Sequence, residues 1–206
     1  METAMNKFRN SITTIATLII FASFLGGCAS NEAITKELTE SAEFIPPNNK
    51  ALITGSVSMY GGHFGWFTLK NTTTGETQTV GAINADDEYS WNARTGRGRT
   101  YLLELDPGLY EIIDWEYKVF VLGGTQIITP KNMKPIALNL KAGDQFYLGD
   151  FNFEMIVGKN IFGLNVPASV KVKVRDKRTR DLNNLKKKFP HLVLSDIKNY
   201  ILNYAQ

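Results

Sequence analysis

The chain contains a single cysteine, Cys28, and only two histidines, His63 and His191. One cysteine cannot form a disulfide within the chain or supply the repeated thiolates of a structural zinc site. A metal or acid–base site built on His63 would need partners at ligand spacing, and none lies nearby in the sequence. We therefore expect no cofactor and no metal site, and we expect a packed core to provide the stability.

Several patterns that identify enzymes are also missing. The sequence has no Gly-x-Ser-x-Gly nucleophile turn and no Gly-x-x-x-x-Gly-Lys-Ser/Thr phosphate loop. The acidic run Asp86-Asp87-Glu88 lacks the alternating ligand positions of an EF-hand. A carboxylate pair for glycoside hydrolysis is identified by its separation in space, which the sequence does not give.

Only one long apolar run is present, at residues 12–25, and it follows the basic residues Lys7 and Arg9. A run of about fourteen residues fits the core of a signal peptide and is too short for a mature membrane-spanning helix. It ends at Leu25-Gly26-Gly27-Cys28, which resembles the lipobox of bacterial lipoproteins. An uncleaved N-terminal membrane helix with an incidental cysteine is the alternative.

The lipobox resemblance implies cleavage before Cys28, a diacylglyceryl thioether on its sulfur and an acyl chain such as palmitate on its new amine. One acyl chain binds a membrane only marginally, but three together hold firmly. The residues after Cys28 are Ala29 and Ser30, not aspartate. In a Gram-negative cell this resemblance implies the outer membrane, with the protein facing the periplasm.

The composition along the chain predicts four parts. Residues 1–27 form the lipoprotein signal peptide, and residues 28–49 form a polar, lipidated tether that ends in Pro46-Pro47-Asn48-Asn49. Residues 50–175 form a β-sandwich, and residues 176–206 form a basic helical C-terminal segment.

The β prediction depends on short stretches of alternating polarity. Ala51, Ile53, Val57 and Met59 share one face of an extended segment, and the other face is polar, with Thr54, Ser56 and Ser58. Further stretches of this kind are separated by clusters of Gly, Asn and Asp, and they lie at residues 64–70, 77–83, 101–105, 136–140, 145–155 and 170–175. The fold class we predict is mainly β, an antiparallel β-sandwich.

The period changes after Arg175. Asp176 is a candidate helix cap, and Leu182, Leu185 and Phe189 recur at helical spacing until Pro190. Ser195 is a second candidate cap, before an apolar face formed by Ile197, Tyr200, Ile201 and Tyr204. We therefore expect two short C-terminal helices.

Two segments carry a further resemblance. Leu105-Asp106-Pro107-Gly108-Leu109-Tyr110 resembles the strand-turn-strand hairpin of prealbumin-like and carboxypeptidase-regulatory-type sandwiches. The stretch from Lys141 to Asp150 resembles one in uncharacterised bacterial lipoproteins, where a basic helical tail also follows. Both resemblances imply the fold and no particular activity.

Basic residues are concentrated near the C-terminus. Residues 171–190 contain nine basic and two acidic residues, whereas the rest of the mature chain is acidic. The candidate residues for binding an anionic surface are Lys171, Lys173, Arg175, Lys186, Lys187 and Lys188. Anionic lipids, acidic envelope polymers or another envelope protein are the expected partners, and nucleic acid is not. Protection of an outer strand by lysines is the alternative role.

Three tryptophans, Trp66, Trp91 and Trp115, either fill the core or form a platform for stacking sugars. Trp91 lies beside polar residues and is the candidate for glycan stacking. Together these features predict a lipid-anchored cell-envelope protein with a non-enzymatic binding or structural role. A sugar- or peptidoglycan-directed envelope enzyme is the alternative.

Overall fold

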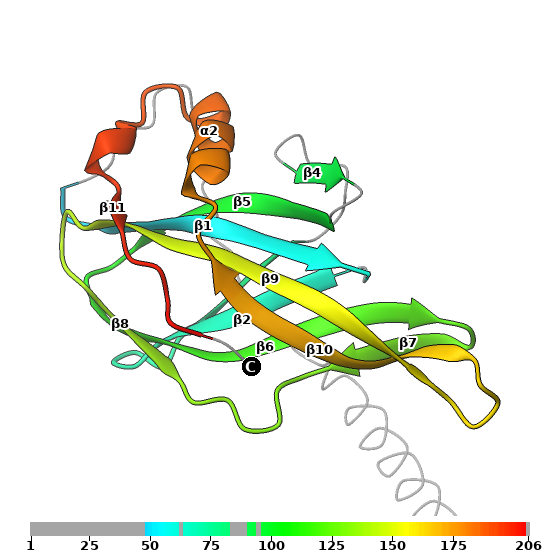
Figure 1. Cartoon of the computed structure of the whole chain (residues 1–206). Helices are drawn as coiled ribbons and strands as arrows, with labels where there is room; N and C mark the ends of the chain where they lie inside the picture. The colour runs from blue at the N-terminus through cyan, green and yellow to red at the C-terminus, as the bar shows by residue number, and fades with distance from the viewer. Residues whose placement is uncertain (1–47, 62–63, 83–89, 94–95, 205–206) are drawn as a thin grey trace, which may run out of the picture. The chain divides into compact units, whose positions relative to one another are not determined.

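The computed structural model describes residues 48–61, 64–82, 90–93 and 96–204 (Figure 1). By its contacts the chain divides into two units, Met1–Glu32 and Ala33–Gln206, and all described residues belong to the second. The predicted signal peptide, Cys28 and most of the predicted tether lie outside the described residues, as does His63.

The described part is mainly β and contains two sheets. The first, sheet A, has the strand order β10-β9-β1-β5-β4, and β11 also pairs with β9. Its strands are β1 (Ala51–Tyr60), β4 (Ser90–Ala93), β5 (Gly96–Leu105), β9 (Gln145–Lys159), β10 (Asn165–Arg175) and β11 (Lys198–Asn199). The pairs β1–β9 and β11–β9 are parallel, so the prediction of purely antiparallel pairing was wrong for this sheet.

The second sheet, sheet B, has the order β3-β2-β6-β7, and β8 pairs with the first part of β6. Its strands are β2 (Phe64–Asn71), β3 (Thr77–Ala82), β6 (Gly108–Val121), β7 (Gly124–Ile128) and β8 (Ile136–Leu140). All of its pairs are antiparallel. Sheet B therefore has the pairing that the sequence predicted.

The two sheets face each other across one apolar core, in a sandwich-like arrangement (Figure 1). The aromatic ring of Phe67 from sheet B stacks on Phe151 from sheet A at 4.6 Å between centroids. Trp115 is buried in the same core and donates a 2.8 Å hydrogen bond to the Tyr204 hydroxyl. Of the two roles considered for the tryptophans, Trp115 therefore fills the core.

The predicted strand-turn-strand segment around Pro107 joins the two sheets. It links β5 in sheet A to β6 in sheet B, so it is a connection between sheets and not a hairpin of paired strands. The Tyr110 hydroxyl donates a 3.0 Å hydrogen bond to the Asp106 carbonyl, which fixes the turn. This arrangement resembles the tyrosine corner of sandwich proteins.

An irregularity in β9 decides which side chains face the core. Opposite β1, the register moves from Thr54–Tyr147 to Ser56–Asp150, so β9 has one extra residue. Gly149 lies in this bulge with φ of +102°. Because a shift of one residue exchanges the two faces of a strand, the bulge directs Phe151 into the core and Asp150 to the outer face.

A helix covers part of that outer face. α2 (Arg178–Lys188) directly follows β10 and buries Leu182 and Leu185 against Tyr147 in a second apolar cluster. Its N-cap is Lys177, one residue after the predicted cap Asp176, and no side chain makes a capping hydrogen bond there. The Asp176 carboxylate instead accepts a 3.0 Å hydrogen bond from the Arg178 backbone N–H. The first of the two predicted C-terminal helices is therefore present.

The second predicted helix was wrong. Residues 194–196 form the 3-10 turn η1 (Leu194–Asp196), and the chain then runs extended along β9. β10 pairs with β9 only from Asp150 onward, so β10 leaves the backbone groups at the start of β9 without a partner on that edge. The tail pairs with them, because Tyr200 N–H donates to Tyr147 O at 2.8 Å and Leu202 N–H to Leu148 O at 3.2 Å.

Candidate functional site

The outer face of sheet A carries a buried polar cluster beneath the first turn of α2. At its centre the Ser56 hydroxyl is 2.9 Å from Asp150 Oδ1 and 2.8 Å from Asp181 Oδ2. Ser56, Asp150 and Asp181 are fully buried. The cluster therefore joins three distant parts of the chain: β1, the bulge of β9 and α2.

Two arginines neutralise the buried carboxylates. Arg175 at the end of β10 donates hydrogen bonds to Asp150 Oδ2 from Nη2 at 2.8 Å and from Nε at 3.2 Å. Arg180 on α2 donates from Nε to Asp181 Oδ1 at 2.8 Å and lies 3.4 Å from Asp150 Oδ1. A buried carboxylate requires such partners, because an unpaired buried charge is strongly destabilising.

Tyr147 completes the cluster. Its hydroxyl donates a 2.7 Å hydrogen bond to Asp181 Oδ2 and accepts a 3.1 Å hydrogen bond from the Lys177 backbone N–H. Burial, and then the negative charge of Asp181, raise the pKa of Tyr147, so the phenol stays protonated. Burial also raises the pKa of Asp181, an effect opposed by Arg180, Tyr147 and Ser56.

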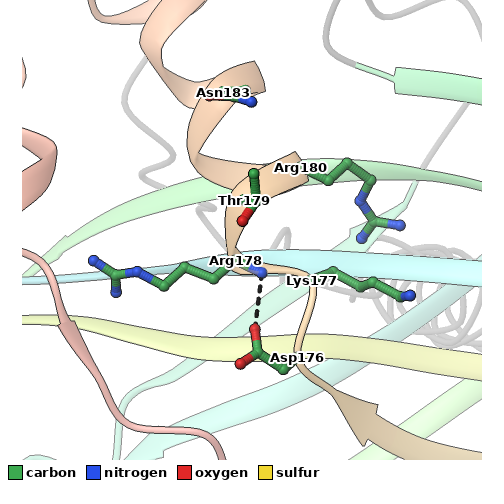
Figure 2. A pocket seen from close by; sticks show the side chains of 6 residues that line it. All are labelled: Asp176, Lys177, Arg178, Thr179, Arg180 and Asn183. Carbon is green, nitrogen blue, oxygen red and sulfur yellow. Dashed lines mark hydrogen bonds between the residues drawn. The ribbon is translucent and has the colours of Figure 1, made fainter.

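A hollow of about 710 Å³ opens to solvent beside this cluster. The residues that line it belong to the end of β10 and the first turns of α2, and they are Asp176, Lys177, Arg178, Thr179, Arg180 and Asn183. Figure 2 shows Lys177 and Arg180 extending to one side of the helix start, while Arg178 extends to the other. Three cationic residues and one acidic residue line the hollow, which favours an anionic ligand.

The three basic residues predicted on β10 have different surroundings. Lys171 is exposed, and Lys173 Nζ lies 3.5 Å from Glu154 Oε2. Arg175 is committed to Asp150 within the buried cluster. Lys171 is therefore the most exposed of these three residues.

The three lysines predicted at the C-terminal end of the basic segment lie in the last turn of α2. Lys186 Nζ donates a 2.9 Å hydrogen bond to the Leu192 carbonyl, and Lys188 Nζ lies 5.9 Å from the centroid of the Phe189 ring. Lys187 is exposed. These lysines are separated from β10 by the length of the helix, so the predicted basic residues form two groups.

Trp91 lies in β4, and its side chain is outside the described residues. The strand register places its backbone position in the same row as a residue of the basic strand β10, at the opposite edge of the sheet. Trp91 pairs with Gly98, Gly98 with Ser58, Ser58 with Asn152, and Asn152 with Lys173. The glycan-stacking candidate and one basic candidate therefore lie at the two ends of one row that crosses β4, β5, β1, β9 and β10.

Apart from Arg175, the residues of the buried cluster were not among the predicted site residues. Tyr147 and Asp150 lie in the stretch predicted as a strand at residues 145–155. Ser56 was predicted only as part of the polar face of the first strand. The signal that could have indicated them is the Gly149-Asp150 pair, a glycine and a charge inside a strand that is otherwise apolar. Lys177, Arg178 and Arg180 contributed to the predicted basic segment but were not candidate site residues.

Within the described ranges, no group of three or more His, Cys, Asp or Glu side chains is placed to hold a metal ion. The same ranges contain no helix that is long and apolar enough to cross a membrane. Comparison with protein-family models, with curated proteins and with solved structures found no match.

Proposed function

We propose that the protein is a lipid-anchored protein of the cell envelope that acts by binding an anionic envelope ligand and not by catalysis. The anchor in this proposal is Cys28, which is supported by the sequence motif Leu25-Gly26-Gly27-Cys28. The binding role is supported by the chemistry at the start of α2. The location is the cell envelope, and the outer membrane if the cell is Gram-negative.

One observation carries the choice of binding over catalysis. The two carboxylates of the site, Asp150 and Asp181, are fully buried and are neutralised by Arg175 and Arg180. General acid–base catalysis needs a carboxyl group that reaches the proton it transfers. The groups that do reach solvent at the hollow are mostly cations, which suit the recognition of phosphate or carboxylate groups.

A hydrolase acting on envelope glycans is the second candidate. It is favoured by the pairing of Asp150 and Asp181 on one hydroxyl, Ser56, and by the raised pKa of Asp181. Glycosidases use two carboxyl groups whose unequal environments keep one protonated and the other ionised. This candidate requires glycan hydrolysis that is lost in both Asp150→Asn and Asp181→Asn while the folded structure is retained.

The anchor is tested by mass spectrometry of the mature N-terminus after production in bacterial cells. We expect a chain that begins at Cys28 and carries a diacylglyceryl group and an N-acyl chain. The Cys28→Ser variant should lack both modifications and accumulate with its signal peptide attached. An unmodified Cys28, or a mature chain that begins elsewhere, would contradict the proposal.

A further inference from the structure

Two hairpin tips project from the same end of the two facing sheets. The rings of Tyr117 on β6 and Phe153 on β9 stack across the core at 5.9 Å. Beyond these rings β6 runs on into the β6–β7 turn, and β9 runs on into the β9–β10 turn. Figure 1 shows both hairpins at the end of the sheets opposite the start of β1.

The side chains at these two tips are apolar and exposed. Leu122 in the β6–β7 turn is fully exposed, and in the β9–β10 turn Ile161 is 93% exposed and Phe162 is 79% exposed. Leu164 beside them is also exposed. Apolar side chains left this exposed gain little from folding, and exposed apolar patches of this kind mark interaction sites.

The β9–β10 tip is a formed turn that holds these side chains outward. Asn160 Oδ1 accepts hydrogen bonds from the backbone N–H of Phe162 at 2.9 Å and of Leu164 at 3.0 Å. The Asn160 N–H donates to the Leu164 carbonyl at 3.0 Å, and Gly163 has φ of +74°. The tip is therefore preorganised, which lowers the entropy cost of binding.

The charges near the tips match a membrane surface. Lys118 is the only charged residue in positions 117–130, and Lys159 is the only one in positions 155–170. Apolar side chains can enter the boundary between headgroups and acyl chains, while lysines behind them meet anionic headgroups. Neither of these two ranges contains an acidic residue, which anionic headgroups would repel.

The length of the tether allows the tips to reach the membrane that would hold Cys28. The 22 residues from Cys28 to Asn49 span up to about 75 Å when extended, at about 3.3–3.6 Å per residue. The 15 residues of β9, the longest strand, span about 50 Å at about 3.3 Å per residue. A membrane tethered at this distance is present at high effective concentration.

From these observations we infer that Leu122, Ile161 and Phe162 insert into the interface of the lipid bilayer that carries the anchor. This inference depends on the proposed anchoring at Cys28. The protein would then contact its membrane at two places, through the N-terminal lipid and through the two hairpin tips. A second contact would fix the orientation of sheet A and its cationic hollow relative to the membrane.

The test uses the full-length chain in liposomes that contain nitroxide-labelled lipid. In separate variants, a cysteine introduced by Ile161→Cys or Leu122→Cys carries an environment-sensitive fluorophore, and Thr73→Cys is the matched control. The thioether of the proposed anchor blocks labelling at Cys28. Thr73 is exposed in the β2–β3 turn, which lies at the other end of the sheets. We expect nitroxide quenching at Ile161 and Leu122 to be several-fold stronger than at Thr73.

Added salt and a charge substitution at a tip distinguish insertion of the apolar side chains from attraction of the lysines to anionic headgroups. Quenching at Ile161→Cys should persist between about 0.1 M and about 1 M salt, because burial of apolar groups is not screened. Adding Phe162→Glu to the Ile161→Cys variant should reduce the quenching several-fold. Loss of the quenching at high salt would overturn insertion.

Flotation of the liposomes distinguishes failure of the anchor from failure of this inference. A chain that does not float with the liposomes would overturn both the proposed anchor and the inference that depends on it. A chain that floats while its tips are quenched no more than Thr73 would overturn the inference alone. Tips that are protected from solvent only at high protein density would indicate a second copy as the partner and would likewise overturn it.

Discussion

The Tyr147 hydroxyl donates a 2.7 Å hydrogen bond to Asp181 Oδ2 and thereby joins β9 to the first turn of α2. Both residues are fully buried. Tyr147→Phe would remove this donor from a buried carboxylate and leave the Lys177 N–H without its acceptor. We expect a loss of about 2 kcal/mol in the free energy of unfolding, measured by urea denaturation of the protein beginning at Ala33.

Tyr101→Phe is the matched control for this prediction. The Tyr101 hydroxyl is also buried, but it has no hydrogen-bond partner in the described structure. Its removal should leave stability unchanged or raise it slightly, because an unsatisfied buried polar group is costly. Equal losses in the two variants would show that ring packing, not the hydrogen bond to Asp181, sets the effect.

Two basic residues of β10 should differ sharply in their contribution to stability. Arg175→Ala would leave the fully buried Asp150 without its closest cation, and we expect a loss of about 3 kcal/mol in the free energy of unfolding. Lys173→Ala breaks a 3.5 Å pair with Glu154 that is partly open to solvent, so its effect should be below about 1 kcal/mol. Similar midpoints of urea unfolding for the two variants would contradict the structural role of Arg175.

The raised pKa of Asp181 predicts a specific dependence of stability on pH. Between the ordinary value of 3.8 and the raised value, the folded protein holds a proton at Asp181 that the unfolded chain releases. The contribution of this group to the free energy of unfolding therefore falls as pH rises through that interval. Asp181→Asn should remove the effect, because an amide does not titrate.

Urea denaturation of wild type and Asp181→Asn at a series of pH values, starting near 3.8, measures this effect. The stability of wild type relative to the variant should decline with rising pH. A relative gain for wild type over the same interval would show that Arg180, Tyr147 and Ser56 outweigh the cost of burying the charge.

The bulge at Gly149 should tolerate no side chain. With φ of +102°, a Cβ at this position would lie 2.5 Å from Val174 Cγ1 and 3.2 Å from the Arg175 carbonyl oxygen. Gly149→Ala should therefore strain β9 and displace β10, with a large drop in the thermal midpoint. Gly75→Ala is the control, because Gly75 has φ of +78° with nothing within 4 Å and should show only the modest backbone cost.

The alternation of apolar and polar residues in β1 correctly predicted which residues face the core, but it wrongly suggested that the other face is open to solvent. Ala51, Ile53 and Val57 lie in the core, as predicted. Thr54 and Ser56 were expected on a polar face, yet they are buried. Alternation distinguishes the two faces of a strand, but it does not show that a distant segment such as α2 covers the polar one.

The C-terminal tail and the site illustrate the same limit. Ile197, Ile201 and Tyr204 follow helical spacing, but the open edge of β9 offers backbone partners that favour an extended chain. The pairing of Asp150 with Asp181 depends on a one-residue bulge and on the docking of α2. Local periodicity does not show the extended tail or the pairing of the two carboxylates, because each depends on contacts with distant parts of the chain that override local preference.

The last prediction concerns the two groups of basic residues and an anionic ligand. A labelled poly(glycerol phosphate) should bind the protein beginning at Ala33, and its affinity should fall steeply with salt. The physical reason is screening, since the Debye length decreases from about 10 Å at 0.1 M to about 3 Å at 1 M. Replacing Lys186, Lys187 and Lys188 by glutamate should weaken the binding several-fold, while the cations of the hollow at the start of α2 remain. The fold should be preserved, because these lysines lie at the surface of α2.

The control has the same change in charge at exposed lysines elsewhere, namely Lys131→Glu, Lys134→Glu and Lys141→Glu. If the ligand recognises the basic segment, this control should retain most of the affinity, because its lysines lie outside residues 171–190. Equal losses in the two triple variants would mean that net charge alone attracts the polymer. Absence of binding at low salt would assign the lysines to solubility and edge protection and would remove the support for an anionic partner.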